Sequence, residues 1–284
     1  MGSGMESALV DVQWLRQNLA DENLVLLDAT IAKVGQPAPP DSYLDTRLPG
    51  ARDFDMKQVF VDRSARSPNT VPTPAHFEAQ ARLLGVSRGS LVVIYDHHGV
   101  YSSPRAWWMF RAMGHESVFV LDGGLPSWTE AGLETTGPEA YSGPAGDFEA
   151  KPVESWLCLS AQVLEATGDS GTCILDARPL GRFAATDPEP RPEVRGGHIP
   201  GSRSLPASQL VANGKLLSPG ELSERFTGKL DREQRLVCSC GSGVTACIVA
   251  LAAYEQGHRN ISVYDGSWAE WGANHDLPLE TGES

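Results

Sequence analysis

The sequence predicts an α/β chain of two tandem domains of the same kind, each a mainly parallel sheet flanked by helices. Short apolar runs of strand length alternate with segments of helical periodicity, the pattern of a parallel sheet with helices on both faces. Landmarks of the first half recur in the second: Asp122 returns as Asp265 after 143 residues, and Gly50 as Gly201 after 151. A repeat this long indicates duplication of a whole domain, and 284 residues suffice for two domains.

The first half contains three expected helices and three expected strands. Apolar residues at helical spacing predict helices over residues 10–19, 76–84 and 104–113, the last starting with a proline whose missing N–H is not needed there. Continuous apolar runs predict buried strands within residues 24–29, 91–96 and 118–124. Residues 61–75, rich in Arg, Ser, Pro and Thr, predict a long irregular segment.

The second half repeats this order after a linker. Gly-Pro pairs and isolated glycines interrupt any periodicity in residues 135–155, which we interpret as the linker. The first domain is therefore expected to cover residues 6–134, and the second residues 156–281. Apolar runs that begin at Ile174, Leu236 and Ile261 correspond to the three strands of the first half.

The composition excludes several classes of partner. A net charge of −13 disfavours binding to nucleic acid or to an anionic membrane. No apolar run reaches the roughly 18 residues of a membrane span, and the N-terminus lacks the order of a signal peptide. The five cysteines all lie in the second half, an odd and one-sided set that makes a poor disulfide framework. We therefore expect a cytoplasmic protein.

Cys240 occupies the position most indicative of chemistry. A strand-like run ends just before it, glycines 241 and 243 follow, and a helix-like run starts at Ala246. Parallel sheets bind ligands at the carboxyl ends of their strands, and loop N–H groups and the helix dipole there favour a thiolate. In the first half Asp96 stands in place of the cysteine, so we expect that domain to be non-catalytic.

The other cysteines are interpreted differently. Inert packing is the favoured role of Cys173 and Cys247, because each lies inside an apolar run. Cys238 could resolve an oxidised Cys240, although near neighbours in an extended chain close a disulfide badly. No metal site is expected, because these two cysteines are only two residues apart and no second Cys or His pair has ligand spacing.

Four further segments carry a family resemblance in addition to the duplication. They are Tyr-Ser-Ser-Pro-Arg-Ala-Trp-Trp-Met at 101–109, Gly-His-Ile-Pro-Gly at 197–201, Cys-Gly-Ser-Gly-Val-Thr at 240–245 and Tyr-Asp-Gly-Ser-Trp at 264–268. Together they resemble the tandem rhodanese-like sulfurtransferases over nearly the whole chain. The loop at Cys240 resembles that of the 3-mercaptopyruvate sulfurtransferases, whereas thiosulfate-preferring rhodaneses carry Arg and Lys where Gly241 and Ser242 stand.

The resemblance implies a reaction in two steps. The Cys240 thiolate would attack the sulfur of 3-mercaptopyruvate to give a persulfide and pyruvate enolate, and a thiol acceptor such as thioredoxin, or cyanide, would take the outer sulfur. It also implies that Arg182 and Arg191 hold the carboxylate and carbonyl of the donor, which a planar guanidinium suits. The loop residues Gly241, Gly243, Val244 and Thr245 would surround the transferred sulfur. No metal or organic cofactor is implied.

Ser242 matches a catalytic serine of the family, but its usual partners do not carry over. The resemblance places Asn69 where a histidine is expected and Lys57 where an acid is expected. Arg178, by contrast, could pair with an aspartate such as Asp176, which ends the first strand of the second half.

Three other functions were weighed against this one. A thiosulfate sulfurtransferase of the same fold is the nearest alternative, and a sulfur-carrier or binding module without catalysis is the non-enzymatic one. A protein phosphatase on a related scaffold is rejected, because the sixth residue after Cys240 is Ala246 rather than the arginine that would hold phosphate.

Overall fold

The computed structural model describes residues 7–33 and 45–282, which divide into two compact units. The first unit comprises residues up to 61, 71–153 and 213–216, and the second comprises 62–70, 154–212 and 217–284. Two short segments are thus assigned to the unit opposite to that of their sequence neighbours, and residues 135–153, expected as linker, belong to the first unit. Residue 6, the expected start of the first domain, lies outside the described residues.

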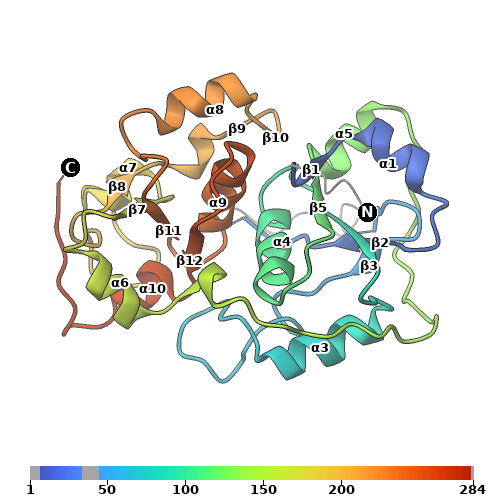
Figure 1. Ribbon diagram of the computed structural model, residues 1–284, viewed down its shortest axis with the longest axis horizontal. Coiled ribbons are helices and arrows are strands. Elements are labelled where there is room, and N and C mark those ends of the chain that lie inside the picture. Colours follow the sequence, from blue (N-terminus) through green and yellow to red (C-terminus); the bar gives the residue numbers. More distant parts are fainter. Residues whose placement is uncertain (1–6, 34–44, 283–284) are drawn as a thin grey trace. The chain divides into compact units, whose positions relative to one another are not determined.

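The first unit is built on a five-stranded parallel sheet (Figure 1). Its strands run in the order β1-β5-β4-β2-β3, and every neighbouring pair is parallel. The strands are β1 (Leu9–Val10), β2 (Leu24–Asp28), β3 (Arg52–Asp53), β4 (Leu91–Tyr95) and β5 (Val118–Leu121). The central strands are buried on both faces, which explains why they consist of unbroken apolar runs.

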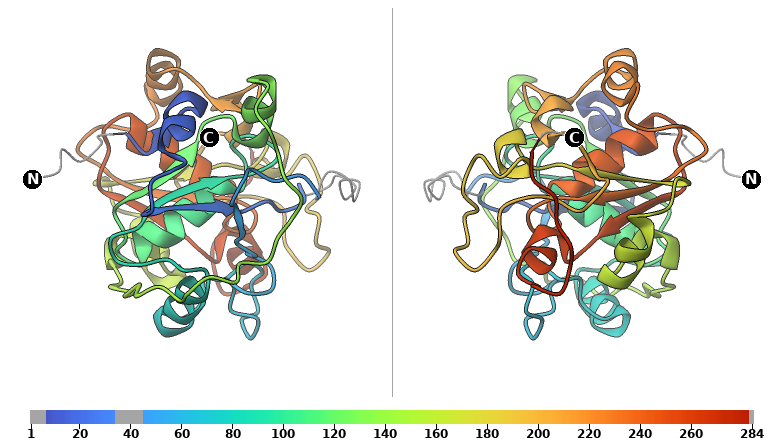
Figure 2. Two further views of the ribbon diagram at one scale, coloured as in Figure 1. Left: turned by 90° about the vertical axis from the view of Figure 1, so that its right-hand side faces the viewer. Right: turned by 90° about the vertical axis from the view of Figure 1, so that its left-hand side faces the viewer.

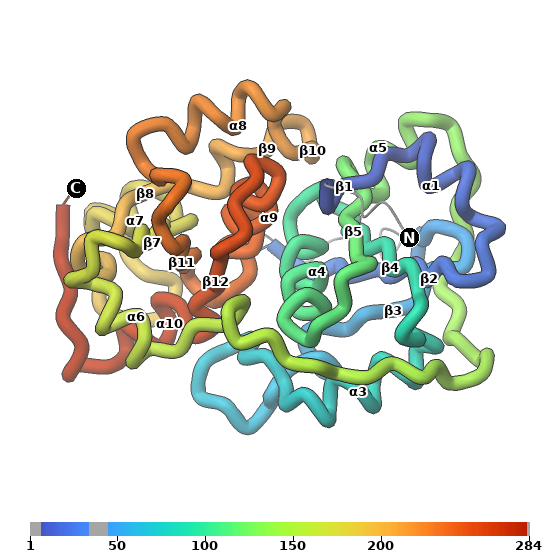
Figure 3. Tube along the Cα trace, viewed as in Figure 1, coloured from blue at the N-terminus to red at the C-terminus, as the bar shows by residue number. Residues whose placement is uncertain are grey.

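Helices cover both faces of this sheet. They are α1 (Val12–Asn18), α3 (Pro74–Leu83), α4 (Ser103–Ala112) and α5 (Gly124–Glu130). Leu15 of α1 and Trp128 of α5 pack in one apolar cluster with Val93 of β4. On the other side, Phe77 of α3 and Phe110 of α4 stack edge to face, 5.0 Å between ring centroids. Residues 135–153, which were expected as a linker, run beside α3, as Figure 3 shows.

The second unit repeats the same sheet. The strand order is β6-β12-β11-β7-β8, again parallel throughout, so each strand corresponds to one of the first unit. The strands are β6 (Leu157–Cys158), β7 (Thr172–Asp176), β8 (Arg203–Ser204), β11 (Arg235–Ser239) and β12 (Ile261–Tyr264). The prediction of two mainly parallel sheets flanked by helices is therefore confirmed.

The helices of the second unit again lie on both faces, which the side views of Figure 2 show. They are α6 (Ser160–Ala166), α7 (Leu180–Phe183), α8 (Pro219–Phe226), α9 (Ala246–Glu255) and α10 (Ser267–Trp271). Single turns η1 (Glu154–Trp156) and η2 (Ala207–Gln209) and the short strand β9 (Val211–Ala212) also belong to this unit, whereas the short strand β10 (Lys215–Leu216), which pairs with β9, is assigned to the first. Val163 of α6 and Trp268 of α10 pack on the same sheet face, in a cluster with Val237 of β11.

Two helix starts illustrate local signals that the sequence carries. α3 begins at Pro74, two residues before the predicted start, because the Thr73 hydroxyl accepts the His76 N–H and caps the helix. α8, which was not predicted, begins with a capping box in which Ser218 and Glu221 bond each other reciprocally. That Ser-x-x-Glu pattern would have identified the helix.

Candidate active site

Cys240 lies at the carboxyl end of the central strand of the second unit. It directly follows β11, which is flanked by β12 and β7, and it precedes the N-terminus of α9 by one short loop. The residue is almost wholly buried, with 1% of its surface exposed. This is the position at which parallel α/β sheets bind ligands, as the sequence predicted.

The loop after Cys240 is held so that one N–H faces the sulfur. The Gly243 N–H donates to Cys240 Sγ over 3.1 Å, and Gly243 adopts φ +79°, a conformation that favours glycine. The carbonyls of Cys240 and Gly241 instead accept the N–H groups of Trp268 (2.8 Å) and Ala269 (3.0 Å) in α10. These carbonyls are engaged by α10, while the Gly243 N–H is directed at the sulfur of Cys240.

The remaining residues of the loop form the start of α9. Val244 is buried, and its carbonyl accepts the Cys247 N–H over 3.1 Å. The Thr245 carbonyl likewise accepts the Ile248 N–H over 3.1 Å. Both residues thus make helical turns close to Cys240. The apolar Val244 side chain has no hydrogen to donate, and the Thr245 hydroxyl makes no hydrogen bond to the sulfur among the described contacts.

The neighbouring thiols are poor nucleophiles. None of the five cysteines forms a disulfide in the described structure. Burial raises the pKa of the Cys238 thiol well above its usual value, and it raises the pKa of Cys173 to about 11. Both side chains therefore stay protonated and neutral near pH 7, which is consistent with packing roles.

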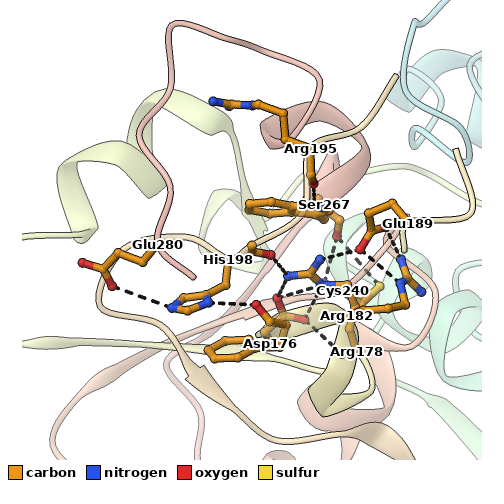
Figure 4. A network of polar contacts seen from close by, with 12 residues as sticks. Asp176, Arg178, Arg182, Glu189, Arg195, His198, Cys240, Ser267 and Glu280 are labelled. Carbon is orange, nitrogen blue, oxygen red and sulfur yellow. Dashed lines mark hydrogen bonds and ion pairs between the residues drawn. The ribbon is translucent and has the colours of Figure 1, made fainter. Parts of the chain in front are cut away.

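Arg182 lies beside the Cys240 loop and is held by a carboxylate that the sequence analysis did not single out. Its Nε and Nη2 atoms donate to both oxygens of Glu189, over 3.1 and 2.6 Å. A Cβ atom added to Gly241 would lie only 2.9 Å from Arg182 Nη2, so the guanidinium covers that glycine closely. Figure 4 shows the pair next to Cys240.

Arg178 links this pair to the end of β7. Its guanidinium donates to Asp176 Oδ2 over 2.6 Å and to Glu189 Oε1 over 2.9 Å, and the arginine is 99% buried. Its Cζ atom also lies 4.4 Å from the Trp268 ring centroid. The proposed pairing of Arg178 with Asp176 is therefore observed. Two arginines and two carboxylates form this network, so their formal charges cancel.

Arg191 differs from Arg182 in its surroundings. It is half-buried, two residues beyond Glu189, and its side chain makes no hydrogen bond or ion pair with any residue in the described ranges. No contact in those ranges joins it to the Cys240 loop. The structure thus places Arg182 beside the Cys240 loop and leaves Arg191 without a carboxylate partner among the described residues.

Asn69 and Ser242 are in direct contact. The Asn69 amide donates to Ser242 O over 2.9 Å and to Ser242 Oγ over 3.2 Å, and both residues are buried. A side-chain amide cannot take up a proton near neutral pH, so Asn69 orients the serine without acting as its base. Lys57 belongs to the other compact unit, where its N–H donates to Asp55.

Ser267, at the start of α10, also contacts Cys240. The Cys240 N–H donates to Ser267 Oγ over 3.2 Å, and this hydroxyl lies 3.9 Å from Cys240 Sγ. Neither Ser267 nor Glu189 was predicted from the sequence to lie at this site. The position of Ser267 directly after a strand and a glycine, and that of Glu189 between Arg182 and Arg191, were the available signals.

The corresponding loop of the first unit contains its own carboxylate. Asp96 follows β4 as Cys240 follows β11. Its Oδ2 atom accepts the N–H groups of Tyr101 (2.9 Å), Ser102 (2.8 Å) and Ser103 (2.8 Å), and the Ser103 hydroxyl (2.7 Å). The donors that could stabilise an anion in this loop are therefore already engaged.

Two further properties concern residues 7–33 and 45–282 alone. No group of three or more His, Cys, Asp or Glu side chains in these ranges could hold a metal ion. Their helices are all too short or too polar to cross a membrane.

Comparisons with known proteins agree with this geometry. The rhodanese-like domain model matches residues 11–131 and 160–274. The chain is 38% identical to 3-mercaptopyruvate sulfurtransferase of Escherichia coli K12, over 95% of this chain and 97% of that protein. It is also 38% identical to thiosulfate sulfurtransferase of Cricetulus griseus, over 96% and 94%. The crystal structure of SseA from Escherichia coli, a 3-mercaptopyruvate sulfotransferase, superimposes with a TM-score of 0.83 and 35% identity, covering 92% of this chain and 99% of that one.

Proposed function

Because this chain belongs to the family of rhodanese-like domain proteins, we propose that it transfers sulfur from 3-mercaptopyruvate to a thiol acceptor through a persulfide on Cys240. The observation that carries the proposal is the buried Cys240 at the end of β11, with the Gly243 N–H 3.1 Å from its sulfur. A donor at this distance stabilises a charged sulfur before and after the transfer. The first unit, with Asp96 in the corresponding loop, supplies no nucleophile of its own.

In the first step, the Cys240 thiolate attacks the sulfur of the donor. A bond forms between the two sulfur atoms while the donor's carbon–sulfur bond breaks, and its electron pair leaves on pyruvate enolate. The enolate then takes a proton from water to give pyruvate. Arg182, which lies beside Gly241, and Arg191 are the cations proposed to hold the donor's carboxylate and carbonyl.

In the second step, the thiolate of an acceptor attacks the outer sulfur of the persulfide. The sulfur–sulfur bond to Cys240 breaks, and its electron pair returns to Cys240 as the thiolate. A small thiol or reduced thioredoxin is the proposed acceptor, and cyanide can replace it in an assay. A cytoplasmic location remains a prediction from the sequence.

The charge balance around Arg182 supports a donor with one negative charge. Asp176 and Glu189 neutralise Arg178 and Arg182, so Arg191 is the one arginine of residues 176–191 without a carboxylate partner among the described residues. Gly241 and Ser242 add no charge where thiosulfate-preferring enzymes carry cations. A dianion such as thiosulfate costs more to desolvate than the monocarboxylate of mercaptopyruvate, and a site with so few unneutralised cations offsets that cost poorly. Thiosulfate is nevertheless the second candidate donor, since a relative with that name is 38% identical over nearly its whole length.

The test is a paired donor assay combined with intact-mass measurement. The wild type is expected to prefer 3-mercaptopyruvate in kcat/KM and to gain the mass of one sulfur after donor treatment without acceptor. Cys240→Ser is expected to gain none. A preference for thiosulfate would replace the donor assignment, and no adduct with either donor would favour a binding module over an enzyme.

A further inference from the structure

Ser267 adopts a backbone conformation that its residue type disfavours. Its φ is +50°, in the left-handed region that residues with a Cβ rarely occupy, and its side chain is fully buried. Such a conformation persists only where the surroundings impose it, and it is concentrated at functional sites. Ser267 is therefore placed by its environment rather than by local preference.

The first unit provides an internal comparison. There the corresponding residue is Gly124, with φ +52°. The next N–H makes the same bond in both units: Leu125 donates to Asp96 O over 3.1 Å, and Trp268 donates to Cys240 O over 2.8 Å. The turn thus requires a left-handed residue in each unit. The unit with the aspartate satisfies this with glycine, whereas the unit with the nucleophile retains a serine despite the strain.

The contacts of the hydroxyl explain the serine. Ser267 Oγ lies beside Cys240 (Figure 4) and accepts the Cys240 N–H over 3.2 Å. It donates its own hydrogen to Tyr264 O over 2.8 Å. It also lies 3.9 Å from Cys240 Sγ, so this hydroxyl contacts both the backbone and the side chain of Cys240. We propose that Ser267 is a positioning residue for the nucleophile, fixing the Cys240 backbone through its hydroxyl.

The same hydroxyl has a second possible acceptor when the sulfur is charged. Rotation about the Cβ–Oγ bond would redirect its hydrogen from Tyr264 O to Cys240 Sγ, without any covalent change. A hydrogen bond to a charged group is stronger than one to a neutral carbonyl, so the thiolate and the persulfide anion favour that rotamer. The catalytic consequence rests on the sulfur transfer proposed above, but the effect on the thiolate does not.

Two substitutions separate the hydroxyl from the backbone strain. Ser267→Ala and Ser267→Gly both remove the hydroxyl, and only glycine removes the strain. We expect kcat with 3-mercaptopyruvate to fall about ten- to one-hundred-fold in both, with the donor KM within about twofold of wild type. The glycine variant should unfold at a higher temperature than the alanine variant. Ser239→Ala is the matched control, since that buried hydroxyl has no hydrogen-bond partner among the described residues and its loss should leave kcat unchanged.

Alkylation by iodoacetamide tests the same idea without a sulfur donor. At pH 7, labelling of Cys240, followed by peptide mass mapping, should slow by a similar factor in both Ser267 variants and stay unchanged in the control. Wild-type kcat and labelling rate in the glycine variant would overturn the proposal, because the Ser267 hydroxyl would then be dispensable. A wild type that is alkylated normally but forms no persulfide would count against the proposed function and leave the effect on Cys240 measurable.

Discussion

Replacing Glu189 by glutamine tests whether local charge sets the donor preference. Glu189 is 5% exposed at its side chain and accepts from both Arg178 and Arg182. Glutamine keeps the size and one acceptor oxygen of the side chain but removes the negative charge. The site would then carry one more net positive charge, while Asp176 still holds Arg178.

The magnitude follows from the position of Arg182 between Glu189 and the proposed donor. With the anion on the far side of the guanidinium, the two negative charges would be roughly 7 Å apart, a repulsion of about 2 kcal/mol at an effective dielectric constant of about 20. Because Arg182 is 18% exposed at its side chain, solvent screening reduces this to about 1–2 kcal/mol. A dianion gains this amount twice and a monoanion once, so the ratio of kcat/KM for thiosulfate to that for 3-mercaptopyruvate should rise about 5- to 30-fold.

The assay measures kcat/KM for both donors at low ionic strength, with cyanide as the common acceptor. Glu193→Gln is the matched control, because it makes the same charge change at an exposed position of the same segment. Its donor ratio should stay within about twofold of wild type, since exposed charges are strongly screened. A ratio for Glu189→Gln that stayed at the wild-type value, or moved toward 3-mercaptopyruvate, would refute the reasoning.

Three other predictions concern buried polar contacts. Asn69→Ala should lower kcat about two- to tenfold in steady-state assays with little change in donor KM, because Ser242 loses both contacts; an unchanged kcat would contradict this. Asp96→Asn should lower the free energy of unfolding in urea by about 1–3 kcal/mol, because one oxygen that accepts several donors loses its charge, yet each folded molecule should still form the Cys240 persulfide. Burial raises the pKa of Asp28, but hydrogen bonds from His97 and Thr30 and the charges of His97 and Arg47 together outweigh it and lower that pKa below its usual value. The stability that the Asp28 carboxylate contributes is thus present above pH about 4 and is lost as the pH falls through the lowered pKa. The difference in free energy of unfolding between wild type and Asp28→Asn should therefore narrow below pH about 4 in acid titrations of unfolding. A constant difference would argue against a lowered pKa at Asp28.

The sequence was sufficient for the parts of the molecule that depend on local periodicity. The apolar run of β11, the glycines after Cys240 and the apolar run of α9 are contiguous, so their arrangement as strand, loop and helix could be predicted. The duplication similarly predicted two sheets of the same kind. The assignment of residues 62–70 and 213–216 to opposite units could not be predicted, since it depends on contacts distant in sequence.

The missed residues share a physical reason. Glu189 lies in a segment rich in proline and charge, where nothing distinguishes a buried carboxylate from a solvated one until Arg178 and Arg182 are placed around it. Ser267 contacts Cys240 from 27 residues away, and its left-handed backbone is visible only in three dimensions. Only the resemblance connected Asn69 with Ser242, by placing it where the family has a histidine. A contact that spans 173 residues leaves no local signal in the sequence.

The carboxylate of Asp96 has a consequence for how the catalytic loop can be studied. The carboxylate of Asp96 is covalently part of its own loop, so this acceptor cannot diffuse away from the N–H groups that surround it. In the second unit, a charge in the corresponding loop would come from Cys240 itself, as its thiolate or as its persulfide. The loop at Asp96 can therefore serve as an internal reference for a loop whose N–H groups surround an acceptor. The loop at Cys240 can be compared with it within a single molecule.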